Sequence, residues 1–143
     1  MATNQQTFAL IAVVVVLASF GLGSYNTGSA TVNAMDFSVK SISMPTASSG
    51  WPIEGTAVFS NSGTVSASFV PYRYEVLNEG GSVVFGTTEK ASLIAGKDNA
   101  ATLPKIPWLA TGRYTARITL DYAQRFAETD EGNNVFTSGF VVL

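Results

Sequence analysis

The chain has 143 residues, of which 46% are hydrophobic, enough for one packed domain with an appended segment. Lys and Arg total 8 and Asp and Glu total 10, and this net charge of −2 provides no basic surface for nucleic acid. Cysteine and histidine are both absent, which excludes disulfides, thiolate or imidazole catalysis and the usual zinc, haem and iron–sulfur sites. The composition therefore favours a structural or binding protein over an enzyme, and we expect no cofactor and no metal.

The first part of the chain contains no Asp, Glu, Lys or Arg, and the first charged side chain is that of Asp36. Residues 8–22 read FALIAVVVVLASFGL and are apolar except for Ser19. Such a run predicts a hydrophobic α-helix from about residue 2 to residue 23, followed by a Gly/Ser-rich joint. We therefore expect two units: residues 1–30 as the helix and its joint, and residues 31–143 as a separate domain.

Several interpretations of the apolar run compete. A secretory signal peptide needs a basic region before its apolar stretch, and no Lys or Arg precedes Lys40. A bilayer-spanning helix needs roughly 20 apolar residues, and residues 8–23 supply 16, although uncharged polar neighbours extend the run. A core helix of a globular domain does not usually stand before a Gly/Ser-rich joint. The remaining interpretation is a helix that packs against copies of itself and must be apolar on every face.

Small residues within the run favour packing between copies, because they let helix backbones approach each other closely. They are Ala9, Ala12, Ala18, Gly21 and Gly23. The segment resembles the N-terminal helix of archaeal type IV pilins and archaellins, which builds the core of a filament. The resemblance implies a helical homopolymer whose polymerisation core comprises the large apolar residues Phe8, Leu10, Ile11, Val13, Val14, Val15, Val16, Leu17, Phe20 and Leu22.

From Phe37 onward, short alternating runs are separated by Gly, Pro, Asn and Ser. The clearest run, residues 113–122, alternates five polar with five apolar residues, as a half-buried strand does. No segment after Gly28 has a helical period. The pattern predicts a mainly β fold, a seven-stranded antiparallel immunoglobulin-like β-sandwich. We expect its strands at residues 37–44, 53–61, 72–77, 82–87, 100–106, 113–122 and 135–143.

Tyr114 follows the turn at Gly112 and stands at the start of the clearest strand. This position resembles the tyrosine corner of immunoglobulin-like and fibronectin-like sandwiches, in which the tyrosine hydroxyl bonds to nearby backbone. An ordinary core tyrosine is the alternative. The missing cysteine pair excludes an antibody-type domain.

Residues 36–143 carry five motifs that together resemble the CARDB domain, a cell-adhesion-related sandwich of bacterial and archaeal surfaces. The motifs are DFSV at 36–39, VFSNSGT at 58–64, LIAGK at 93–97, GRY at 112–114 and AETDEGNN at 127–134. They occur in the family's order over about three quarters of the chain. The resemblance implies an immunoglobulin-like fold and a cell-surface location.

The last of these motifs concentrates side-chain oxygens, from Glu128, Asp130, Glu131, Asn133 and Asn134. Carboxylates and amides at such spacing suit Ca²⁺, although the pattern is not that of the EF-hand loop. Asparagine also bonds to its own backbone and tolerates turn conformations, so a solvated turn before the last strand explains the motif without a metal. We expect the turn, with calcium binding as the alternative.

The chain has two tryptophans, Trp51 and Trp108, and each neighbours a proline. Packing in a core or an interface is the commoner use of tryptophan. A carbohydrate-binding or hydrolytic accessory domain would instead expose one of them beside a groove.

Together these features predict a structural subunit of an extracellular, cell-surface filament that serves adhesion or motility. Its hydrophobic helices would form the filament core and its sandwiches the outer sheath. Its main partner would be itself, with cell-surface or S-layer components as further partners and the membrane only before assembly. The alternative is a membrane-anchored surface module of the archaellum accessory or S-layer-binding type.

Overall fold

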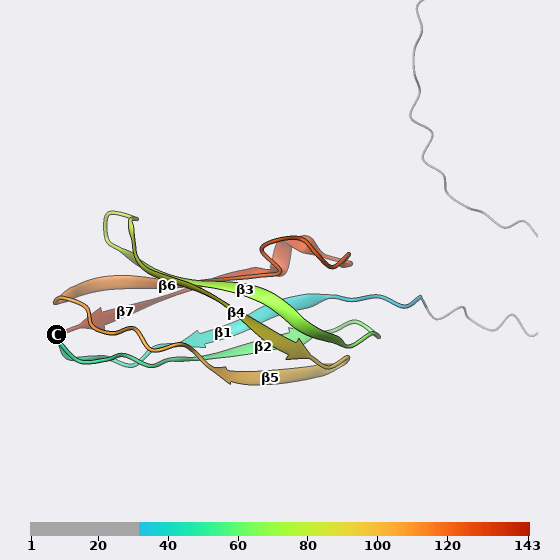
Figure 1. Cartoon of the computed structure of the whole chain (residues 1–143), viewed down its shortest axis with the longest axis horizontal. Helices are drawn as coiled ribbons and strands as arrows, with labels where there is room; N and C mark the ends of the chain where they lie inside the picture. The colour runs from blue at the N-terminus through green and yellow to red at the C-terminus, as the bar shows by residue number, and fades with distance from the viewer. Residues whose placement is uncertain (1–31) are drawn as a thin grey trace, which may run out of the picture. The chain divides into compact units, whose positions relative to one another are not determined.

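The computed structural model of the protein describes residues 32–143 (Figure 1). The predicted N-terminal helix lies outside these residues, and the predicted division of the chain at residue 30 stays a prediction. Within the described part, no helix is long and apolar enough to cross a membrane. Its elements are β1 (Phe37–Ser43), β2 (Thr56–Asn61), β3 (Ala67–Asn78), β4 (Val83–Leu93), β5 (Lys97–Thr102), β6 (Gly112–Leu120), the 3₁₀ helix η1 (Glu131–Asn133) and β7 (Val135–Val142).

The strands form two antiparallel sheets that lie in two layers (Figure 1). One sheet has the strand order β1-β2-β5, and the other has the order β4-β3-β6-β7. Each of the seven predicted strands overlaps one observed strand. The prediction of a mainly β, seven-stranded antiparallel sandwich is therefore confirmed for the described residues.

The bounds of three strands, β3, β4 and β5, differ most from the prediction, because apolar alternation fails there. β4 continues to Leu93 through a largely exposed stretch, where the prediction ended at residue 87. β3 starts at Ala67, earlier than predicted, since the register shifts between Ala67 and Val70 and Phe69 has a φ of 59°. This irregularity interrupts the period of two that the prediction relies on. β5 begins at Lys97 and ends at Thr102, because this edge strand is almost wholly exposed and carries no alternating apolar face.

The core lies between the two sheets and is built from alternate residues of the facing strands. The ring of Phe59 on β2 contacts the ring of Tyr72 on β3, with 5.0 Å between their centroids. Because side chains on a strand alternate between its faces, every second residue of β3 and β6 is buried. These residues are Val70, Tyr72, Tyr74 and Val76 on β3, and Ala116, Ile118 and Leu120 on β6.

Hydrogen bonds join the two sheets along one side, where β1 and its flanking residues run parallel to β7. The Thr129 N–H donates to the Met35 carbonyl at 2.9 Å near the start of β1. Beyond the end of β1, the Ala47 N–H donates to Val141 at 3.2 Å, and the Leu143 N–H donates to Ala47 at 2.8 Å. The first described residues, which precede β1, and the end of β7 lie at opposite ends of the sandwich (Figure 1).

Candidate functional site

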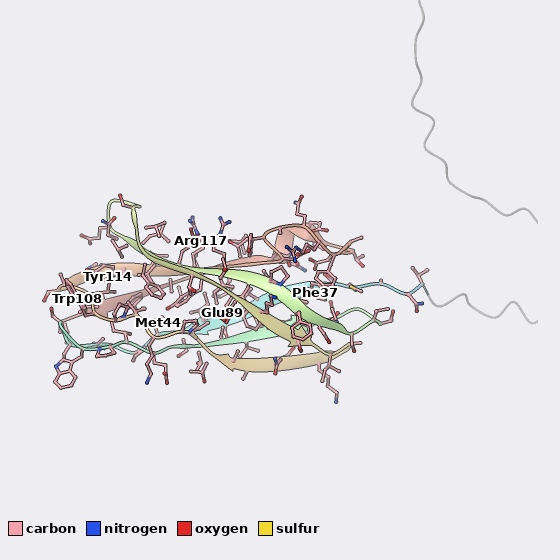
Figure 2. All side chains as sticks on the ribbon, viewed as in Figure 1. Phe37, Met44, Glu89, Trp108, Tyr114 and Arg117 are labelled. Atoms are coloured by element: carbon pink, nitrogen blue, oxygen red, sulfur yellow. The ribbon has the colours of Figure 1, made fainter. Side chains whose placement is uncertain are left out.

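Tyr114 fixes the connection between β5 and β6. Its hydroxyl donates to the carbonyl of Ala110 at 2.9 Å, and its ring stacks on Phe140 with 5.7 Å between centroids. The predicted tyrosine corner is therefore confirmed. Trp108 belongs to the connection that this bond holds, and Figure 2 shows Trp108 and Tyr114 at the same end of the sandwich.

Glu128 ties the segment before η1 to the first strand. Its Oε2 accepts a hydrogen bond from the Phe37 N–H at 2.6 Å, and its Oε1 accepts one from the Asn134 amide at 2.9 Å. The backbone N–H of Glu128 in turn donates to Oε1 of Glu131 at 3.2 Å. Burial raises the pKa of the half-buried Glu128 carboxyl, although the hydrogen bonds from Phe37 and Asn134 lower it.

The other carboxylates of this turn also bind protein donors. Asp36 accepts hydrogen bonds from the Ser62 hydroxyl and from the Asn133 amide, the latter at 3.1 Å, and these bonds lower its pKa. Asp130 caps η1, since its side chain accepts from the Gly132 N–H at 2.8 Å. The motif residues thus form the turn that the sequence predicted.

Calcium binding at this turn, the alternative interpretation of the motif, stays a prediction. Within residues 32–143, no group of three or more Asp and Glu side chains is arranged to hold a metal ion. The Oδ1 atoms of Asn133 and Asn134 are buried and have no hydrogen-bond partner in the described part of the chain. The amide groups of the same two side chains donate to the carboxylates of Asp36 and Glu128.

The opposite end of the sandwich exposes large apolar side chains. Trp51 is 70% exposed, Trp108 is 63% exposed and Leu143 is 69% exposed. Backbone hydrogen bonds join their segments, because Gly50 N–H donates to Leu109 at 3.4 Å and Ser49 N–H donates to Leu143 at 2.8 Å. We call Trp51, Trp108 and Leu143 the tryptophan surface.

The two tryptophans lie on segments that backbone hydrogen bonds bring together. Ile53 and Ile106 form an isolated antiparallel bridge, with N–H to O distances of 3.0 and 2.9 Å in the two directions. Beyond the prolines the ladder does not continue, because the Trp51 N–H donates to the Ser48 carbonyl at 3.3 Å within a turn. The bond from the Gly50 N–H to the Leu109 carbonyl nevertheless keeps the two segments together, so Trp51 and Trp108 each lie between two linked positions.

Of the predicted packing in a core or an interface, the core is wrong, because both tryptophans are exposed, and the interface stays a prediction. Ile53 and Ile106 are buried core residues. Each tryptophan lies two residues away from one of them, on the other side of a proline, and is outside the core. A signal was present in the sequence: residues 51–53 read WPI and residues 106–108 read IPW. The antiparallel bridge between Ile53 and Ile106 brings these mirror-image tripeptides together. The predicted polymerisation core, Phe8 to Leu22, lies outside the described residues.

The two antiparallel sheets and the tyrosine corner define an immunoglobulin-like sandwich. The chain belongs to the CARDB family, whose model matches residues 34–138. Its fold is similar to that of a CARDB domain from Pyrococcus furiosus solved in complex with di-metal ions, with a TM-score of 0.64, 22% identity and coverage of 78% of this chain and 96% of that chain. It is also similar to a domain of a candidate cell surface protein from Methanosarcina acetivorans, with a TM-score of 0.52, 22% identity and coverage of 77% and 93%. No curated protein matches the chain.

Proposed function

We propose that the chain is a structural subunit of an extracellular filament at the cell surface. The apolar segment, residues 8–22, packs against copies of itself along the filament axis, and the CARDB sandwich forms the outer sheath. The observation that supports the proposal is the junction of an uncharged apolar run to a sandwich with its own core. A sandwich whose core is complete leaves the apolar run free to pack elsewhere.

Assembly rests on apolar burial repeated along the polymer. Each square ångström of apolar surface removed from water contributes roughly 25 cal/mol. A head-to-tail contact whose rotation does not close into a ring produces a fibre. The first described residues and Trp108 lie at opposite ends of the sandwich (Figures 1 and 2), so the domain can be tethered at one end and expose the other.

The test is electron microscopy of material sheared from producing cells, with mass spectrometry of any fibres. Wild-type cells are expected to yield long uniform fibres made chiefly of this chain. Val15→Asp or Leu17→Lys places a charge in the apolar run and is expected to abolish the fibres. The sandwich should stay folded, as judged by its β-type circular dichroism, because neither residue belongs to its core.

Val15→Ala is the matched control, because it changes the same side chain without adding a charge, and it is expected to leave fibres in place. Fibres that persist with Val15→Asp would contradict the proposal.

The second candidate function is a membrane-anchored surface module. The 16 apolar residues at 8–23, with uncharged polar neighbours on both sides, favour it. In this case the chain would stay in the membrane fraction, and detergent would release it as discrete particles without fibres.

A further inference from the structure

We propose that the tryptophan surface binds a neutral carbohydrate chain. This binding activity is independent of the filament, since a filament subunit and an anchored module would both present the same surface. Trp51 and Trp108 are 70% and 63% exposed, and their segments are joined by the Ile53–Ile106 bridge and by the Gly50–Leu109 bond, so both indoles offer flat apolar faces at one end of the sandwich. Within residues 32–143 the two rings do not stack on each other, because the aromatic pairs of this part involve other rings. The apolar faces of sugar rings pack on such side chains.

The chemistry around the indoles matches an uncharged polyhydroxylated ligand. The segments that build this end, residues 41–53, 106–112 and 139–143, contain no Asp, Glu, Lys or Arg. The same segments carry exposed residues with hydroxyl groups instead, namely Thr46, Ser48 and Thr111, whereas the hydroxyl of Ser49 donates to the Leu109 carbonyl at 3.3 Å. Ligand sites commonly combine aromatic walls with a few polar groups that fix orientation. These hydroxyl groups can exchange hydrogen bonds with the hydroxyls of an uncharged sugar.

The size of the surface argues against a second copy of the chain as its occupant. Its three side chains expose on the order of 400 Å². A stable protein interface buries about 800 Å² on each partner. A few sugar rings, in contrast, cover an area of this size.

The charge pattern argues against a membrane surface. Interfacial segments that bind anionic lipid carry Lys and Arg beside their apolar residues. Loop residues 44–52 and 106–112, which carry Trp51 and Trp108, have neither. Of the two cations that flank residues 106–112, Lys105 pairs with Glu54 at 3.5 Å, which leaves Arg113 alone.

The experiment uses the intrinsic fluorescence of the full-length chain, because Trp51 and Trp108 are its only tryptophans. The protein is kept in a detergent without a sugar headgroup, since maltoside detergents would themselves compete. It is titrated with cellohexaose, chitohexaose, maltohexaose and mannohexaose. We expect at least one of these sugars to shift the emission to the blue in a saturable manner.

Variants assign the binding to the surface. Trp51→Ala and Trp108→Ala are each expected to weaken the affinity by about tenfold or more. Phe69→Ala is the matched control, because Phe69 is an aromatic side chain that is 71% exposed at the start of β3. It is expected to bind as the wild type does.

Three results would overturn the proposal. The first is an unchanged emission with all four sugars, or an equal response from the tryptophan variants. The second is a blue shift that grows with protein concentration without sugar, which would assign the surface to a second copy. The third is a blue shift with phosphatidylcholine vesicles but not with sugars, which would assign it to a membrane.

Discussion

Two side chains each hold a loop of the sandwich through bonds to backbone atoms. Tyr114 binds the carbonyl of Ala110 and so fixes the connection that carries Trp108. Glu128 binds the N–H of Phe37 and so fixes the start of β1 against the segment before β7. Both residues were recognisable in the sequence from family motifs, and the partner of Tyr114 is only four residues away. For Glu128 the partner is 91 residues away, and only the folded topology brings the two together.

Glu128→Ala is expected to destabilise the fold, because it leaves the Phe37 N–H and the Asn134 amide without their acceptor. The cost of such unpaired groups is about 1–3 kcal/mol. Burial of the Glu128 carboxylate is itself unfavourable, as its raised pKa shows, so removing this carboxylate offsets part of the cost. Glu131→Ala is the control, since this exposed carboxylate accepts one bond at 3.2 Å. The free energies of unfolding are measured by urea titration followed by circular dichroism. A larger loss for Glu131→Ala than for Glu128→Ala would contradict the expectation.

At the level of the elements, the strands were predictable because each half-buried run alternates with a period of two. β6 shows this best, with Ala116, Ile118 and Leu120 buried and the residues between them turned away. The exposed edge strand β5 and the irregular start of β3 lack that pattern, so their bounds were missed. The position of the tryptophans was missed for another reason. Exposure beyond the Ile53–Ile106 pair depends on how two distant loops meet, and local alternation holds no information about it.

The loop between β2 and β3 contains a glycine that the packing requires. A Cβ at Gly63 would collide with the Ala34 carbonyl and would lie 2.8 Å from the Met35 Cα. The same carbonyl accepts the Thr64 N–H at 2.8 Å, so the backbone cannot retreat without losing this bond. Gly63→Ala is therefore expected to cost about 1–3 kcal/mol of unfolding free energy.

The control for this change is Gly80→Ala in the exposed turn between β3 and β4. There the nearest atom to an added Cβ, Oδ1 of Asn78, lies 3.4 Å away. Its effect is expected to stay within about 0.5 kcal/mol. Equal losses of unfolding free energy for the two variants in urea titrations would count against the close approach at Gly63.

For the whole molecule, the centre of the core contains a polar group that titrates at high pH. Tyr74 is fully buried, and its hydroxyl donates to the sulfur of Met44 at 3.7 Å. Burial raises the pKa of Tyr74 to about 12. Burial also raises the pKa of Tyr72, its neighbour along the same face of β3.

Stability is expected to fall as the pH rises from about 10 to about 12. Unfolded tyrosine loses its proton near pH 10, whereas folded Tyr74 keeps it until about pH 12. In this window the folded state binds more protons than the unfolded state, so the free energy of unfolding decreases with pH. Tyr74 alone contributes a slope of up to about 1.4 kcal/mol per pH unit. Urea unfolding between pH 9 and pH 11.5 measures the slope, and an undiminished slope in Tyr74→Phe would refute the assignment.

The hydrogen bonds that join the residues on either side of β1 to Thr129 and to the end of β7 have a mechanical consequence. A pulling force between the first described residues and Trp108 is directed along the strands, because these two places lie at opposite ends of the sandwich (Figures 1 and 2). Under such a force β1 slides lengthwise past β2, while Met35 and Ala47, on either side of β1, slide past Thr129 and the end of β7. These hydrogen bonds then stretch together rather than opening one after another, as they would if the strand were peeled away. The fold is therefore suited to carry tension applied between its two ends.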